Sequence, residues 1–105
     1  MTRPALEMHP QAAEEAAAAR EWYAARSERA AERFVAELDD AMEHIIDSPN
    51  QWPPYLRGTR QYTLRHFPYL VVYQATETTV RIIAVAHGRR KPGYWKSRTP
   101  TEDPA

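Results

Sequence analysis

The chain contains no cysteine, and only three glycines occur among its 105 residues. Without cysteine it can form neither a disulfide framework nor a thiolate metal site, which agrees with a reducing compartment. The glycines are too scattered for a phosphate-binding loop. No apolar run approaches the roughly 20 residues that cross a bilayer, and the first residues contain no apolar core of a signal peptide. We therefore expect a cytoplasmic protein that does not enter a membrane.

Histidine and serine often build reactive sites, but here they show no informative spacing. His9, His44, His66 and His87 are far apart and share no ligand pattern, so the sequence predicts no metal and no cofactor. The serines lack the local signature of a nucleophile.

The net charge is zero, but the two halves of the chain differ. Residues 1–47 hold five basic and eleven acidic residues, giving −6, and residues 48–105 hold nine basic and three acidic residues, giving +6. These segments cover the whole chain, and their charges cancel. The division fits either a dipolar surface or scattered, solvated charge, and the sequence leaves both open.

Two helices are predicted in the acidic half. Residues 10–26 are rich in alanine, the best helix former, and Pro10 suits the first turn. Glu14 and Glu15 near the start and Arg26 near the end complement the helix dipole. The apolar face of this helix is small, so a neighbour can approach closely; it consists of Ala12, Ala16, Ala19 and Tyr23.

Residues 28–47 show the strongest helical periodicity, and Ser27 is the expected N-cap. Apolar residues recur at spacings of three and four, which is typical of a helix packed on a core. They are Ala31, Phe34, Val35, Leu38, Met42, Ile45 and Ile46. Asp39, Asp40 and Glu43 are interpreted as a solvated face. Because the joint is so short, the two helices should form an antiparallel hairpin.

Runs rich in β-branched and aromatic residues predict strands at 59–65, 69–75 and 80–87. A short first strand is expected at 4–8, where the apolar residues Ala5, Leu6 and Met8 do not alternate cleanly. Short connections between the last three favour an antiparallel meander. The order β-α-α-β-β-β indicates an α+β fold with two layers, a helical hairpin packed on a small, mainly antiparallel sheet. The length fits one domain, 1–96, and the polar segment 97–105 is expected to be a flexible tail.

The last predicted strand leads directly into a basic, aromatic segment. Its members are His87, Arg89, Arg90, Lys91, Tyr94 and Trp95. Such a set could bind phosphates and stack on bases. It could also cleave RNA, with His87 or Tyr94 moving protons while an arginine stabilises the phosphorane. Alternatively, the two aromatic residues anchor the chain on the sheet, and the cations stay hydrated or pair with a protein partner.

Two stretches carry a family pattern. They are Arg65-His-Phe-Pro-Tyr-Leu-Val-Val-Tyr73, and Val80-Arg-Ile-Ile-Ala-Val-Ala-His-Gly-Arg-Arg-Lys-Pro-Gly-Tyr-Trp95 followed by Arg98. With the preceding strand and hairpin, they resemble the RelE/ParE superfamily of toxins from bacterial type II toxin–antitoxin systems, and most of all the ParE, or plasmid-stabilisation, branch. The resemblance implies a small cytoplasmic toxin that an antitoxin neutralises. RelE-type members cleave mRNA in the ribosomal A site, whereas ParE-type members inhibit DNA gyrase.

When the RelE-type cleavage positions are matched to this sequence, few of them hold the residues that RelE-type members use. The cationic positions on the middle strands fall on Gln61, Thr63 and Leu70, which are neutral. Only Arg89 and Tyr94 match the arginine of the last strand and the tyrosine of the tail. Since a phosphodiester-cleaving site needs cationic stabilisation of the developing charge, the missing cations favour a toxin that binds gyrase or another protein target. DNA gyrase as the expected target is implied by the resemblance to the ParE branch alone. The alternative is a ribosome-dependent mRNA endoribonuclease, so enzymatic activity stays open.

Three groups of residues have predicted roles. If the chain is an endoribonuclease, the catalytic residues are His87, Arg89 and Tyr94. If it binds a protein target, the contact surface is formed by Arg89, Arg90 and Lys91, with Tyr94 and Trp95 as structural anchors. An amphipathic antitoxin segment is expected to place carboxylates on Arg60, Arg65 and Arg81. The toxin alone is not expected to bind DNA sequence-specifically.

Overall fold

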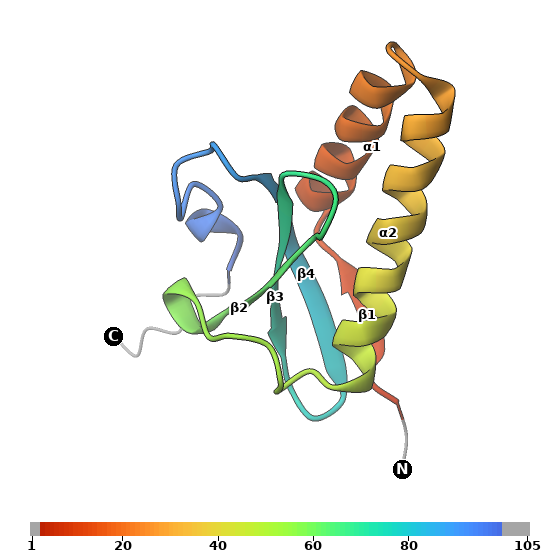
Figure 1. The fold of residues 1–105 in the computed structure, drawn as a ribbon. Coiled ribbons are helices and arrows are strands. Elements are labelled where there is room, and N and C mark those ends of the chain that lie inside the picture. Colours follow the sequence, from red (N-terminus) through yellow and green to blue (C-terminus); the bar gives the residue numbers. More distant parts are fainter. Residues whose placement is uncertain (1–2, 100–105) are drawn as a thin grey trace.

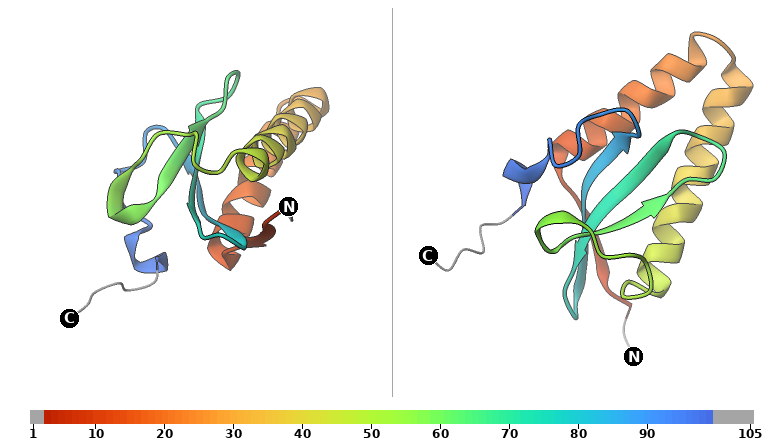
Figure 2. Two further views of the ribbon diagram at one scale, coloured as in Figure 1. Left: turned by 90° about the horizontal axis from the view of Figure 1, so that it is seen from below. Right: turned by 60° about the vertical axis from the view of Figure 1, so that its left-hand side comes forward.

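The computed structural model describes residues 3–99. Two helices cover one face of a four-stranded sheet, and the C-terminal segment lies on its other side (Figures 1 and 2). The predicted α+β fold is confirmed. Its elements are β1 (Ala5–Met8), α1 (Pro10–Ala24), α2 (Glu28–Asp47), the 3-10 helix η1 (Leu56–Gly58), β2 (Arg60–Thr63), β3 (Tyr69–Ala75), β4 (Thr79–His87) and the 3-10 helix η2 (Lys96–Arg98).

Helix α1 begins where the sequence predicts and ends two residues earlier. Pro10 is in its first turn, and the His9 ring accepts a hydrogen bond from the Gln11 backbone N–H (3.1 Å). Arg26 lies just beyond the helix. Its guanidinium donates to the Trp22 carbonyl (2.8 Å) and lies over the Trp22 ring. A side chain therefore satisfies a carbonyl that a longer helix would have bonded internally.

Helix α2 has the predicted bounds. The Ser27 hydroxyl accepts a hydrogen bond from the Ala30 N–H (3.1 Å), which confirms the predicted N-cap. The buried residues follow the predicted stripe with two differences: Ala41 is buried, and Val35 and Met42 are only partly buried against the core. The buried residues are Ala31, Phe34, Leu38, Ala41, Ile45 and Ile46. Within residues 3–99, neither long helix is apolar enough to span a bilayer.

The sheet has the strand order β1-β4-β3-β2. β1 is parallel to β4 and the other neighbours are antiparallel, so the sheet is mainly antiparallel as predicted. β3 has the predicted bounds. β2 is shorter than the predicted 59–65 because the chain turns after Thr63, where the Leu64 N–H donates to the Tyr69 carbonyl (3.0 Å). β4 begins one residue before the predicted start.

One irregularity in β4 helps to give the sheet two apolar faces. Val72 opposes Ala84 whereas Tyr73 opposes Ile82, so Ile83 is an extra residue in its strand, a β-bulge. As a result, Ile83 and Ala84 both join the apolar cluster on the side of the C-terminal segment. The strand residues on the other face form the larger core with α1 and α2.

The segment after β4 covers the second apolar face. Trp95 is 1% exposed and contacts Tyr55 there (ring centroids 5.9 Å), which confirms its predicted anchoring role. Residues Lys96–Arg98 form a turn of 3-10 helix, and Thr99 is buried. The predicted flexible tail therefore does not include residues 97–99, because this stretch is folded against the sheet. The rest of that predicted tail lies outside the described residues.

Candidate functional site

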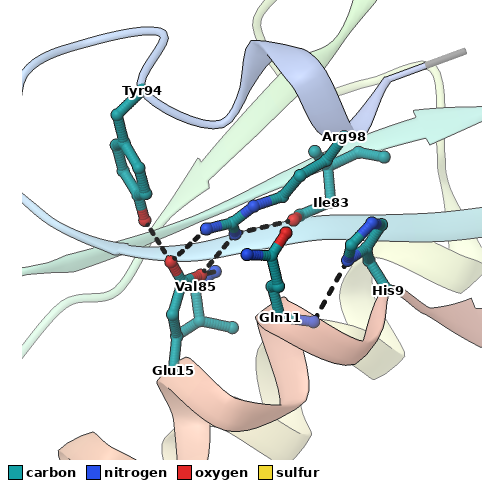
Figure 3. Close-up of polar contacts among 7 residues, drawn as sticks. All are labelled: His9, Gln11, Glu15, Ile83, Val85, Tyr94 and Arg98. Atoms are coloured by element: carbon teal, nitrogen blue, oxygen red, sulfur yellow. Dashed lines mark hydrogen bonds and ion pairs between the residues drawn. The ribbon is translucent and has the colours of Figure 1, made fainter.

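A polar cluster centred on Glu15 joins α1, β4 and the C-terminal segment (Figure 3). Glu15 Oε2 accepts hydrogen bonds from the Tyr94 hydroxyl (2.7 Å) and Arg98 Nη2 (2.9 Å). Its Oε1 accepts from Arg98 Nη1 (2.9 Å) and the Val85 N–H (3.0 Å). Arg98 Nη1 also donates to the carbonyl of the bulge residue Ile83 (3.2 Å). We call Glu15, Tyr94 and Arg98 the Glu15 cluster.

The electrostatics of this cluster fix its protonation. Burial would raise the pKa of Glu15, but hydrogen bonds from Arg98, Tyr94 and the Val85 backbone together outweigh it, and the pKa is lowered. Burial and the hydrogen bond to Glu15 raise the pKa of Tyr94 well above its ordinary value. The hydrogen bonds to Glu15 raise the pKa of Arg98. The cluster therefore contains a carboxylate, a neutral phenol and a guanidinium, and Tyr94 keeps its proton at neutral pH.

A groove of about 430 Å³ lies beside the Glu15 cluster, between α1 and the end of β4. Ala18 and Ala19 line it on the α1 side, and Pro68 lines it on the side of the β2–β3 turn. Trp22 is 52% exposed, so a large apolar side chain of the groove remains open to solvent. We call it the aromatic groove, because its lining includes Trp22, Tyr23, Tyr69 and Tyr94.

The predicted target-binding residues lie together next to this groove. Arg89, Arg90 and Lys91 are exposed in the loop that follows β4, and we call them the cation loop. Arg90 lines the groove, and its guanidinium lies 3.8 Å from the centre of the Tyr94 ring. Within residues 3–99, none of the three forms a salt bridge. The loop therefore presents three cations at one side of an aromatic groove.

Two of the three candidate catalytic residues, His87 and Tyr94, line the same groove, and the Tyr94 hydroxyl and one ring nitrogen of His87 already form hydrogen bonds. The Tyr94 hydroxyl donates to Glu15, and His87 Nδ1 accepts a hydrogen bond from the Arg89 backbone N–H (3.0 Å). The His87 and Tyr69 rings also form a T-shaped pair (ring centroids 5.0 Å). These contacts hold the Tyr94 side chain against Glu15 and the His87 ring against Tyr69.

The face of the sheet opposite the hairpin holds the positions at which the resemblance expects cations. Thr63 pairs with Leu70 and Gln61 pairs with Val72, so these residues lie side by side on one face. Leu70 packs against the apolar cluster that contains Val72 and Trp95. The structure thus brings the three positions together, and all three side chains are neutral.

Comparison with known proteins assigns this arrangement to a family. A model of the ParE toxin of the type II toxin–antitoxin system parDE matches residues 6–92. The chain belongs to the ParE toxin family. Toxin ParE2 of Mycobacterium tuberculosis, from strains CDC 1551 and H37Rv, is 34% identical over 55 residues, 52% of this chain and 52% of each relative. The match thus spans about half the length of these curated relatives.

A solved structure supports the fold of this ParE family member. The chromosomal ParDE toxin–antitoxin system from P. aeruginosa matches with a TM-score of 0.71, at 17% sequence identity. The match covers 81% of this chain and 96% of that chain. The two-layer arrangement of hairpin and sheet is therefore shared despite low sequence identity.

The three arginines predicted to contact an antitoxin do not form one cluster. Arg60 opposes Tyr73, which belongs to the core between the sheet and the two helices α1 and α2. The Arg60 guanidinium donates a hydrogen bond to the Trp52 carbonyl (2.7 Å). Arg65 is exposed in the turn between β2 and β3. Arg81 points to the sheet face away from the two helices, because its neighbours Val80 and Ile82 both face the core beneath α1 and α2. An antitoxin that contacted all three would have to reach both faces.

A second carboxylate, Glu37 on α2, holds the turn between β2 and β3. It accepts hydrogen bonds from the backbone N–H groups of Arg65 and His66 and from the His66 ring (2.9 Å). We call Glu37 and His66 the Glu37 cluster. It lines a hollow of about 390 Å³, which the hydrogen-bonded pair His44 and Tyr62 (2.9 Å) also lines. Burial would raise the pKa of Glu37, but the hydrogen bonds from His66 and the backbone outweigh it, and the pKa is lowered.

The roles of Glu15 and Arg98 were not predicted from the sequence. Glu15 was interpreted through the helix dipole, and Arg98 fell in the expected tail. A local signal was present, because Glu15 lies three residues after Ala12 and four before Ala19, which are both buried. A carboxylate on the buried face of a helix needs a cation or hydrogen-bond donors, although the helix sequence does not identify them.

Proposed function

We propose that the chain is a toxin that arrests growth by binding DNA gyrase, and that a partner antitoxin neutralises it in the cytoplasm. Membership of the ParE toxin family supports the toxin role. The preference for a protein target over RNA rests on one observation, the neutral side chains at Gln61, Thr63 and Leu70 on the sheet face opposite the hairpin.

Phosphodiester cleavage requires groups that move protons and donors or cations at the oxygens on which charge develops. Gln61, Thr63 and Leu70 supply no cation. The Tyr94 hydroxyl donates to Glu15, and its raised pKa makes it a poor general base. The cation loop is exposed and lies beside an aromatic groove, which is a combination common in protein interfaces.

The test combines induction of the chain in a bacterial host with a supercoiling assay on purified gyrase. We expect growth arrest, loss of supercoiling as toxin is added, and intact mRNA by primer extension. Replacing Arg89 and Arg90 together by Ala should abolish arrest and leave the melting temperature nearly unchanged, because both side chains are exposed. Normal supercoiling beside rapid mRNA cleavage would contradict the proposal and favour the ribosome-dependent endoribonuclease.

We also propose that antitoxin carboxylates pair with Arg60, Arg65 and Arg81. Reversing these charges should weaken antitoxin binding more at low salt than at high salt, because exposed charge pairs are screened. The Arg60 variant also loses its hydrogen bond to the Trp52 carbonyl, so its folding must be checked first. Antitoxin affinity unchanged by all three reversals would remove these arginines from the interface.

A further inference from the structure

We infer that the aromatic groove holds an acidic loop of the toxin's protein target, with one large side chain of that loop in the groove and its carboxylates on the cation loop. The groove's role depends on the proposed function, because it is the place where the target would be held. Three features carry the assignment, namely the size of the groove, the chemistry of its rim and its charge.

The size of the groove fits a short loop. About 430 Å³ is at the small end of the range of binding pockets, and it accommodates one or two side chains. An amphipathic helix needs a longer groove, because its anchors recur over two or more turns. A single protruding side chain of a folded protein matches the observed volume better than a helical segment does.

The rim carries the residue types that dominate binding energy in protein interfaces, which are Trp, Tyr and Arg. Trp22 is 52% exposed, and the Arg26 guanidinium lies 3.5 Å from the centre of its ring. Arg90 lies in the same way over Tyr94, at 3.8 Å. A guanidinium stacked on a ring can still donate from its N–H edge to a carboxylate, and Arg26 uses one of its five N–H groups on the Trp22 carbonyl. Each pair therefore offers an apolar surface beside a cation.

The charge of the groove selects an acidic partner. Arg90 lines the groove, and Arg89 and Lys91 belong to the same exposed loop. Arg26 adds a further cation beside Trp22. Within the described part of the chain, Glu15 is the one carboxylate in the lining, and Arg98 pairs with it. The groove therefore presents a cationic surface although the chain as a whole is neutral.

A single-stranded nucleic acid would need open ring faces for its bases. Here Arg26 covers a face of Trp22, Arg90 covers a face of Tyr94, and Tyr23 stacks on Phe34 (ring centroids 5.4 Å). Guanidinium groups on the rings favour carboxylates beside an apolar side chain over a row of stacked bases. We therefore assign the groove to a protein loop.

The decisive variant changes one wall of the groove without disturbing the core. Ala17 and Ala18 are adjacent, exposed residues of α1, and only Ala18 lines the groove. Ala18→Glu adds bulk and negative charge there, and Ala17→Glu is the matched control. We expect Ala18→Glu to weaken binding to purified gyrase roughly 30-fold or more, as loss of an interface hot spot does. The control should bind like the wild type, and both should keep the wild-type melting temperature.

Two further pairs test the rim and the charge. Trp22→Ala should weaken gyrase binding, whereas Leu6→Ala, which removes another exposed apolar side chain, should not. Arg90→Glu should weaken binding and Arg29→Glu, an exposed site on α2, should not. Each variant is also induced in cells, so that growth arrest is measured independently of gyrase binding.

The outcomes separate the groove from the identity of the target. If the wild type binds gyrase and the three groove variants bind equally well, the groove assignment is overturned and the proposed function stands. If the wild type does not bind gyrase but its growth arrest is lost only in the groove variants, gyrase is the wrong target and the groove is supported. Groove variants that arrest growth as the wild type does overturn the assignment. Variants that bind gyrase like the wild type but lose affinity for a single-stranded oligonucleotide also overturn it. A wild-type chain that neither binds gyrase nor arrests growth overturns both.

Discussion

The Glu15 and Glu37 clusters hold the hairpin to the sheet in similar ways, but with partners that differ in burial. Each carboxylate accepts a backbone N–H and a hydrogen bond from a basic side chain. The Arg98 and Glu15 side chains are 9% and 17% exposed, whereas those of His66 and Glu37 are 64% and 19% exposed. Arg98 is always charged, and His66 is charged only when protonated. Burial of the cation, more than of the carboxylate, distinguishes the two clusters.

The two clusters also differ in what they connect. Glu15 contacts residues 79 and 83 positions further along the chain, and its partners belong to the segment that covers the second apolar face. Glu37 contacts a turn 28 and 29 positions away. Loss of the Glu15 cluster should therefore expose part of the core, while loss of the Glu37 cluster should loosen one turn.

The largest expected effect is that of Arg98→Ala. It leaves the Glu15 carboxylate mostly buried without its cation, and breaking a buried pair in this way costs about 3 kcal/mol. The melting temperature should fall by about 10 °C or more in thermal denaturation. Lys96→Ala, in the same turn but exposed, is the control and should melt like the wild type. A loss below about 1 kcal/mol would show that water replaces the guanidinium and that burial does not separate the two clusters.

A smaller effect with a distinct pH dependence is expected for Glu15→Gln. At neutral pH the free energy of unfolding should fall by about 1–2 kcal/mol, because charge-assisted hydrogen bonds become neutral ones. The folded-state pKa of Glu15 is below its unfolded value. Its stabilisation is therefore complete above the unfolded pKa and disappears as the pH falls through the folded value. Urea denaturation should be measured at neutral pH and below about pH 4. The difference in the free energy of unfolding between wild type and variant should become smaller in acid. A gap that stays constant contradicts a lowered pKa.

Tyr94→Phe removes a single hydrogen bond of the Glu15 cluster. We expect a loss of about 1 kcal/mol in the free energy of unfolding, measured by urea denaturation. Growth arrest should persist, since the proposed gyrase-binding toxin does not use this hydroxyl in catalysis. Tyr62→Phe, which removes the hydroxyl bonded to His44 beside the Glu37 cluster, is a matched comparison. A stable Tyr94→Phe variant without toxicity would restore the endoribonuclease alternative.

The smallest effect is expected for His66→Ala. Its ring is mostly exposed, so its pair with Glu37 should contribute no more than about 0.5 kcal/mol. The backbone N–H groups of Arg65 and His66 remain bonded to Glu37. Urea denaturation should place the variant close to the wild type. A loss as large as that of Arg98→Ala would mean that the exposed cluster is as important as the buried one.

Local patterns predicted most of the fold. The bounds of α2 and β3 follow from periodicity and from Ser27, because a helix stripe and an N-cap depend on residues a few positions apart. The end of α1 was less well predicted, since Arg26 bonds a carbonyl of the last turn from outside the helix. The shorter β2 likewise depends on a turn closed by Leu64 and Tyr69.

The site was harder to predict than the fold. The cation loop was found because its three cations are consecutive. The partners of Glu15 could not be read from spacing, because Tyr94 and Arg98 meet it only after the chain has folded around the sheet. The aromatic groove has the same origin, since Trp22 comes from α1 and Tyr69 from β3.

The short β1 strand has a consequence for the solubility of the toxin. β1 pairs with β4 only as far as Ile82, so within residues 3–99 no strand lies beside the later part of that edge. An open strand edge is a template on which further copies of a chain can assemble into aggregates. Here the Ile83 carbonyl is bonded to Arg98 and the Val85 N–H to Glu15. Two charged side chains thus occupy the hydrogen-bonding groups to which another molecule would add its own strand, and they protect this edge from strand-by-strand polymerisation.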